Sequence, residues 1–175
     1  MIEHKNAARA SFRPFDIPTI ALTSGGLGFL RPAPGTWGSL PPVMVASILV
    51  WLQLDRLNIA LVLVAFAIAS TAACVVWGDY AEKRFGRKDA AEVVADETAG
   101  VSLPALAAII LFDTEPLAHA ALVAAFILFR LFDISKPWPM KLLEELPAGW
   151  GVVVDDLAAG VYSALIIMAT AWLLI

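Results

Sequence analysis

The chain has 175 residues, of which 60% are hydrophobic and only 16% are charged, and its formal net charge is -4. Together with a strongly positive mean hydropathy, this balance excludes an ordinary water-soluble domain and predicts an integral membrane protein. We expect the lipid bilayer, and no nucleic acid, as a partner of the chain.

The beginning of the chain is polar. The first eighteen residues contain no apolar core and carry charges of both signs, at Glu3, Lys5, Arg9, Arg13 and Asp16. A cleavable signal peptide needs an apolar region, so we expect residues 1–19 to form an N-terminal cytoplasmic tail. Residues 20–175 are then expected to form a single helical membrane domain.

A segment rich in glycine and proline follows, "TSGGLGFLRPAPGTWGSL" over residues 23–40. Its composition predicts an irregular loop. Hydroxyl groups and exposed amides in such a loop can cradle a phosphate, and the hydroxyl residues are Thr23, Ser24, Thr36 and Ser39. The segment lacks the lysine of a P-loop and follows no strand, which excludes the P-loop and dinucleotide-binding motifs. A plain connecting loop is the alternative interpretation.

Two apolar segments carry no charge, Ile59–Trp77 and Leu157–Ile175. Each approaches the length of about 20 residues that crosses the hydrocarbon layer as a helix. Three others are shorter or interrupted by charge, so each fits a tilted span, a re-entrant half-helix or a buried core helix; they are Val43–Leu54, Val101–Phe112 and Leu117–Phe132. The predicted fold class is all-α, a polytopic helical membrane protein.

The loop over residues 79–97 carries four cations, Lys83, Arg84, Arg87 and Lys88. Because cytoplasmic loops are enriched in Lys and Arg, we place this loop and the tail on the cytoplasmic side. Helical hairpins then return every dense polar stretch to the same side. We therefore expect cytoplasmic-face loops to form one site.

Acidic residues gather beside the apolar segments. The spacing of Asp89 and Asp96 would place them two turns apart on one helix face, and Asp96 and Glu97 directly precede an apolar segment. Asp155 and Asp156 lie at the entry to the last span. A solvated helix is the alternative for the loop, and helix capping for one of the last two acids. Capping does not explain both, because adjacent carboxylates repel each other unless a cation neutralises them.

Arg130, Asp133 and Lys136 share one helix face at a spacing of three residues. A simple Arg130–Asp133 salt bridge is one interpretation. The predicted topology, however, brings Asp133 to the other acids, and carboxylates that hold Mg²⁺ beside cations that bind phosphate oxygens suit chemistry on a phosphate ester. Gly160, one turn after Asp156, would let another helix pack closely.

Other phosphatase mechanisms lack their residues here. Cys74, the single cysteine, lies within an apolar span, where packing is its expected role. His4 lies in the tail and His119 near the predicted outward turn, so neither suits a histidine nucleophile. Metal-assisted hydrolysis, with water as the nucleophile, remains.

Four ordered motifs resemble the phosphatidylglycerophosphatase A family: "RPAPGTWGSLPP", "KDAAEVVADETAG", "FRLFDISKPWP" and "GVVVDDLAAGVYSAL". The resemblance covers most of the chain and implies a multi-pass enzyme of the bacterial inner membrane, with its site facing the cytoplasm. It implies Mg²⁺-assisted attack of water on phosphatidylglycerophosphate, which yields phosphatidylglycerol for glycerophospholipid biosynthesis. The metal-site candidates that it implies are Asp89, Asp96, Glu97, Asp133, Asp155 and Asp156. The phosphate-binding candidates are Thr36, Ser39, Arg130 and Lys136.

Within this interpretation, the expected catalytic residues are Asp96, Asp133 and Asp156, with Asp96 or Asp156 orienting the attacking water. A Mg²⁺-dependent phosphatidyltransferase is one alternative, although its motif is imitated only superficially by "GDYAEKRFGRKD". An ion transporter is another, but it would place acids near the bilayer centre rather than at one interface. The sequence does not fix the oligomeric state.

Overall fold

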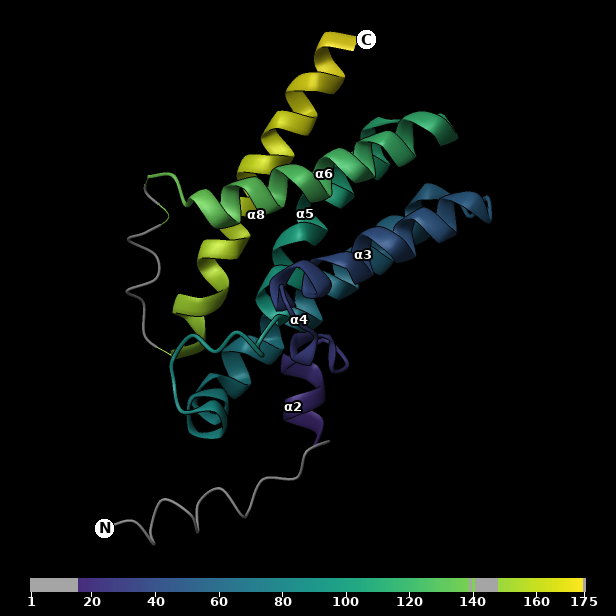
Figure 1. The fold of residues 1–175 in the computed structure, drawn as a ribbon. Coiled ribbons are helices and arrows are strands. Elements are labelled where there is room, and N and C mark those ends of the chain that lie inside the picture. Colours follow the sequence, from purple (N-terminus) through teal and green to yellow (C-terminus); the bar gives the residue numbers. More distant parts are fainter. Residues whose placement is uncertain (1–15, 139, 141–147, 175) are drawn as a thin grey trace, which may run out of the picture.

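The structure is a computed structural model that describes residues 16–138, 140 and 148–174. Within these ranges the chain is all-helical (Figure 1), as predicted. The elements are α2 (Ile17–Leu22), the short 3-10 helix η1 (Leu27–Phe29), α3 (Pro34–Trp51), α4 (Arg56–Phe85), α5 (Ala95–Leu111), α6 (Glu115–Ser135) and α8 (Ala148–Leu174).

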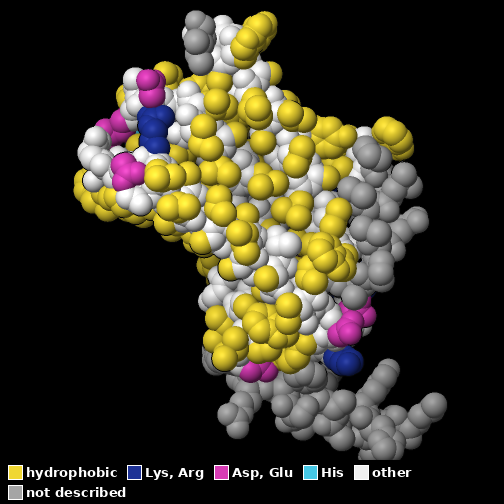
Figure 2. Space-filling model, turned by 180° about the vertical axis from the view of Figure 1, so that it is seen from behind, with side chains coloured by type: hydrophobic (Ala, Val, Ile, Leu, Met, Phe, Trp, Pro, Cys, Tyr) yellow, Lys and Arg dark blue, Asp and Glu magenta, His cyan; other side chains and the backbone are white. Residues whose placement is uncertain are grey.

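Three helices are long and apolar enough to cross a membrane, over Arg56–Phe85, Glu115–Ser135 and Trp150–Leu174. They include both charge-free segments predicted as spans, apart from Ile175, and the previously ambiguous Leu117–Phe132. Apolar side chains cover most of the face seen in Figure 2, and charged side chains gather toward its ends. This surface suits contact with lipid, which confirms the prediction of a membrane protein.

Helix α5 runs through the middle of the structure (Figure 1) and packs against α3, α4, α6 and α8. Most of its side chains are buried, so it is the buried core helix that was one interpretation of Val101–Phe112. Its closest neighbour is α8: a Cβ atom added at Gly160 would lie 2.2 Å from the backbone oxygen of Gly100. The expectation that Gly160 permits close helix packing is confirmed.

The prediction of an irregular loop over residues 23–40 was wrong from Pro34 onward, where α3 begins. Proline is well tolerated in the first turn of a helix, because its missing N–H would have no partner there. Upstream of α3, the Ser24 hydroxyl lies 2.7 Å from the Thr98 hydroxyl. Thr98 also donates a 2.7 Å hydrogen bond to the Gly38 carbonyl. These contacts attach the segment to the first turns of α5.

Asp89 and Asp96 do not share a helix, which corrects a second prediction. Helix α4 ends at Gly86 in the left-handed conformation, and bends and turns connect it to α5. The backbone N–H of Val94 donates to the Leu22 carbonyl at 2.9 Å instead of continuing a helix through Asp89. A tertiary hydrogen bond thus overrides the local helical spacing.

Helix α2 begins one residue after Asp16, whose carboxylate accepts a hydrogen bond from the Thr19 N–H. Hydrogen bonds from Thr19 and from the Tyr80 hydroxyl hold the pKa of Asp16 below its ordinary value. The predicted boundary between residues 19 and 20 falls within α2, and residues 1–15 lie outside the described part of the chain.

Candidate active site

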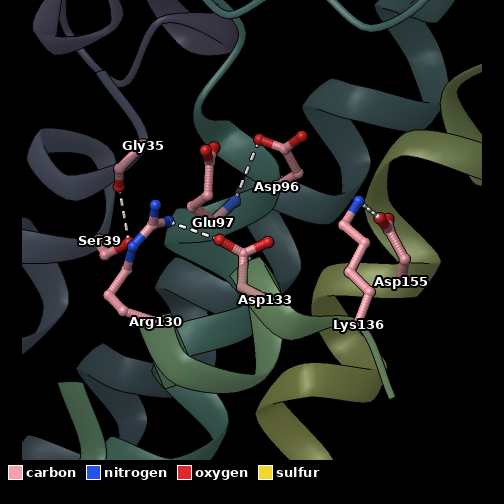
Figure 3. A network of polar contacts seen from close by, with 8 residues as sticks. All are labelled: Gly35, Ser39, Asp96, Glu97, Arg130, Asp133, Lys136 and Asp155. Atoms are coloured by element: carbon pink, nitrogen blue, oxygen red, sulfur yellow. Dashed lines mark hydrogen bonds and ion pairs between the residues drawn. The ribbon is translucent and has the colours of Figure 1, made fainter. Parts of the chain in front are cut away.

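One end of the helical bundle contains a cavity of about 290 Å³. The beginning of α5, the end of α6 and the first turns of α8 form most of its wall, with two residues from the α4–α5 connection. The lining residues are Lys88, Asp89, Asp96, Glu97, Asp133, Lys136, Gly151, Val152, Asp155 and Asp156. Polar side chains from three helices therefore converge at one place (Figure 3).

Two of the carboxylates belong to the first turn of α5. Asp96 is buried, and its Oδ1 accepts a 3.0 Å hydrogen bond from the backbone N–H of Glu97. The residue before the helix, Val94, makes no capping hydrogen bond, and the positive end of the helix dipole lies at this first turn. The helix dipole favours negative charge here, but burial opposes it and raises the pKa of Asp96 and of Glu97 above their ordinary values.

Asp156 of α8 joins these two acids. One carboxylate oxygen from each of Asp96, Glu97 and Asp156 lies within 4.8 Å of the other two. Asp156 is only 4% exposed, and Glu97 Oε2 is buried without a hydrogen-bond partner among the described residues. Three carboxylates this close, two of them on buried residues, repel one another, and a divalent cation would relieve both the repulsion and the missing contact. Their oxygen atoms are the hard ligands that Mg²⁺ and similar cations take.

Arg130 and Asp133 form an ion pair on α6, with 2.7 Å between Nη1 and Oδ2. This is the salt bridge considered from the sequence, and Asp133 lines the cavity as well. Arg130 Nε is buried and has no hydrogen-bond partner among the described residues. The guanidinium is thus held by Asp133 while a buried N–H donor remains for an anion.

At Gly35, the beginning of α3 lies against Glu97 and Arg130. A Cβ atom there would lie 2.2 Å from Glu97 Oε1 and 3.0 Å from Arg130 Nη1. Any larger residue would therefore displace one or both charged groups. Sequence reasoning did not single out Gly35, although a glycine inside a helix is itself a signal, because glycine weakens helices unless space demands it.

On the other side of the cavity, Lys136 and Asp155 form an ion pair, with 2.7 Å between Nζ and Oδ2. Figure 3 shows the lysine side chain rising beside the acid, apart from Glu97 and Arg130. The two residues connect the end of α6 to α8. Lys136 therefore lines the acidic cavity directly, whereas Arg130 lies outside its lining and is joined to it through Asp133.

Some of the predicted site residues line the cavity, and others do not. The six predicted metal-site acids line the cavity, but only three of them form the close carboxylate group. Of the predicted phosphate-binding residues, Lys136 lines the cavity, whereas Arg130, Thr36 and Ser39 are not among its described lining residues. Ser39 is fully buried and donates to the Gly35 carbonyl at 2.7 Å. Lys88 of the cation-rich loop also lines the cavity, and this residue is exposed.

These features define a polytopic helical membrane protein with a carboxylate-rich, cation-flanked site at one end of its bundle. The family model for phosphatidylglycerophosphatase A matches residues 20–171. The chain therefore belongs to the phosphatidylglycerophosphatase A family, which confirms the resemblance of its motifs and makes it a phosphatase.

Individual relatives agree with this membership. The chain is 36% identical over 149 residues to phosphatidylglycerophosphatase A of Haemophilus influenzae, with 82% of each chain covered. It is 34% identical over 170 residues to a putative phosphatidylinositol-3-phosphatase of Bacteroides thetaiotaomicron, covering 93% of this chain and 98% of the relative. It is 27% identical over 162 residues to phosphatidylglycerophosphatase A of Escherichia coli, covering 92% and 87%. No solved structure gives a significant match.

Proposed function

We propose that the chain hydrolyses the terminal phosphate of phosphatidylglycerophosphate to give phosphatidylglycerol and inorganic phosphate. The observation that carries this proposal is the close group of Asp96, Glu97 and Asp156 beside Arg130 and Lys136, in a chain of this family. Two relatives bear the name of this activity and match over most of their length. We accordingly propose a role in glycerophospholipid biosynthesis, since the proposed product is itself a glycerophospholipid.

The three close carboxylates are the proposed ligands of Mg²⁺. When bound, the cation offsets charge on the phosphate and makes water a better nucleophile. Asp96 or Asp156 orients the attacking water and accepts its proton, while Arg130 and Lys136 donate hydrogen bonds to phosphate oxygens. Asp133 lines the cavity and holds the Arg130 guanidinium beside it through their ion pair. The water oxygen bonds to phosphorus, the ester P–O bond breaks, and the lipid alkoxide leaves and takes up a proton.

The position of the site supports a lipid substrate. The cavity lies at an end of the bundle, where a headgroup would enter it while its acyl chains remain beside the apolar surface (Figure 2). We further propose that this end faces the cytoplasm at the bacterial inner membrane. The cation-rich residues 83–88 belong to this end, which agrees with the enrichment of Lys and Arg in cytoplasmic loops.

A phosphoinositide is the second candidate substrate, because the Bacteroides thetaiotaomicron relative is named a putative phosphatidylinositol-3-phosphatase. Both candidates present a phosphate monoester on a lipid headgroup. The acidic group and its flanking cations serve either lipid, so the choice between them depends on the rest of the headgroup.

Phosphate release from both lipids by the detergent-purified protein, with Mg²⁺ or with EDTA, tests the proposal. We expect Mg²⁺-dependent release from phosphatidylglycerophosphate, and a fall of about 100-fold or more for Asp96→Asn, Asp133→Asn and Asp156→Asn, as for other groups acting in a transition state. Asp113→Asn is the matched control, because Asp113 is exposed and lines a separate cavity at the other end of the bundle.

Absence of release from phosphatidylglycerophosphate by the folded wild-type protein with Mg²⁺ would refute the proposed substrate. Release from phosphatidylinositol 3-phosphate alone would establish the second candidate instead. Equal loss in Asp113→Asn would show that the other variants act through folding rather than through the site.

A further inference from the structure

Lys136 has an unusual backbone conformation for its residue type. It ends α6 with φ of 42° and ψ of 64°, in the left-handed region, and its N–H donates to the Phe132 carbonyl at 2.8 Å. Glycine is the usual residue at such a position, because other residues clash there. The next residue is Pro137, which further restricts the backbone before it. A lysine here therefore costs stability that a glycine would not.

The contact made by the Lys136 side chain explains the presence of a lysine at this strained position. From this backbone it reaches back into the cavity, where Nζ lies 2.7 Å from Asp155 Oδ2. The Asp155 side chain is only 6% exposed, so its charge requires a nearby cation. A strained residue that points a charged group into a cleft marks a functional position.

Asp155 and Asp156 face different partners although they are adjacent. Successive residues on a helix differ in direction by about 100°. Asp156 points to α5, where it joins Asp96 and Glu97, whereas Asp155 points to the end of α6 and Lys136. Asp155 is not one of the three acids in the close carboxylate group. The aspartate pair is thus divided between two sides of the cavity.

We propose that Asp155 is a positioning residue for Lys136 and does not ligate the cation. A lysine side chain is long and flexible, and the ion pair to a buried acid on α8 restricts its ammonium group to the cavity wall. The ammonium has three N–H donors, so it binds a phosphate oxygen while Asp155 retains one hydrogen bond. This inference rests on the proposed function and removes Asp155 from the predicted metal-site acids.

A metal-binding measurement distinguishes the roles of Asp155 and Asp156 without requiring enzyme turnover. Mn²⁺ serves as the probe, with free Mn²⁺ followed by electron paramagnetic resonance in titrations of wild type, Asp155→Asn and Asp156→Asn. We expect Asp156→Asn to weaken Mn²⁺ binding by about 100-fold or more, and Asp155→Asn to stay within about 10-fold of wild type. Equal weakening by the two substitutions would overturn the inference.

Kinetics test the link between Asp155 and Lys136. We expect Asp155→Asn to raise KM for the lipid phosphate by about 10-fold, through a poorly placed charged hydrogen bond, with a smaller effect on kcat. Lys136→Met should raise KM as much or more, and adding Asp155→Asn to Lys136→Met should change KM no further. Independent, multiplying effects of the two substitutions would overturn the inference.

Failure of the inference and failure of the proposed function give different results. A wild-type protein that binds Mn²⁺ but releases phosphate from neither lipid refutes the function, and with it the phosphate contact of Lys136. An active wild type whose Asp155→Asn variant loses Mn²⁺ binding refutes only the division between the aspartates. Thermal melting of each variant in the same detergent excludes unfolding as the cause.

Discussion

Gly35 determines how closely α3 approaches the charged groups of the site. The absence of a side chain there leaves room for Glu97 Oε1 and for the Arg130 guanidinium at distances that a methyl group would violate. Enzymes are sensitive to displacements of this size, because about 1 Å of misplacement costs about 100-fold in rate. Gly35 thus contributes geometry, although it offers no chemical group.

We therefore expect Gly35→Ala to lower kcat for phosphate release by about 10- to 100-fold while the protein remains folded. Gly25→Ala is a matched control, because Gly25 has a φ of +76° but no atom within 4 Å of an added Cβ. It should lose about 1 kcal/mol of stability from its backbone conformation and retain activity. The measurements are kcat and the melting temperature of each variant. Full activity of Gly35→Ala would contradict the steric argument.

Residue types and motifs in the sequence located the six cavity acids, Arg130 and Lys136, because charge is rare in so apolar a chain. They did not reveal how these groups pair. Whether Asp155 or Asp156 meets a cation or a lysine depends on which helices lie on either side of α8. That information is tertiary, and the sequence motif "DD" carries none of it.

At the scale of helices, the contact between α5 and α8 fixes the carboxylate group. Gly100 and Gly160 allow the two backbones to touch, one turn beyond Asp96 and Asp156 respectively. Close approach of small residues is a main source of helix association in membranes. The distance between the two acids therefore depends on packing at the two glycines.

Gly160→Ala should separate α8 from α5, because the added Cβ would lie 2.2 Å from the Gly100 oxygen. We expect a loss of about 1–3 kcal/mol in stability, as for other overpacked sites, together with weaker Mn²⁺ binding. Ala169→Val enlarges an exposed position of the same helix and should leave both properties nearly unchanged. Unaltered Mn²⁺ binding in Gly160→Ala would show that the carboxylate group tolerates movement of α8.

Whether a helix could be predicted from the sequence depended on its environment in the structure. Segments facing lipid were recognised from apolar length alone, as in α4 and α8, because the bilayer imposes that pattern. The start of α3 and the end of α4 were not recognised from the sequence. A proline begins α3, and the left-handed Gly86 ends α4. Asp89 was misplaced for the same reason, since α4 stops before it.

At the scale of the whole molecule, the clustered acids of the site lower the stability of the fold. Asp96, Glu97 and Asp156 lie close together in a largely buried setting, where like charges repel. Functional sites commonly reduce the stability of the fold that holds them. Binding of the proposed cation at these acids would therefore be coupled to folding.

Two changes in melting temperature follow. Mg²⁺ should raise the melting temperature of the wild-type protein, since a ligand at about 100 times its Kd adds about 2.7 kcal/mol. In EDTA, Asp156→Asn should melt above wild type because one repelling charge is gone, and Mg²⁺ should stabilise it far less. Asp113→Asn, at the far end of the bundle, should behave as wild type in both conditions. A lower melting temperature of Asp156→Asn in EDTA would argue against net repulsion.

The central place of α5 also bears on how the nascent chain enters the bilayer. Asp96 and Glu97 are synthesised before α6 and α8, yet Asp156, which completes their group, arrives only with α8. Until α8 has been inserted and has docked on Gly100, the proposed cation site would lack Asp156. On the proposed mechanism, an intermediate that lacks α8 would therefore be unable to act on membrane lipids.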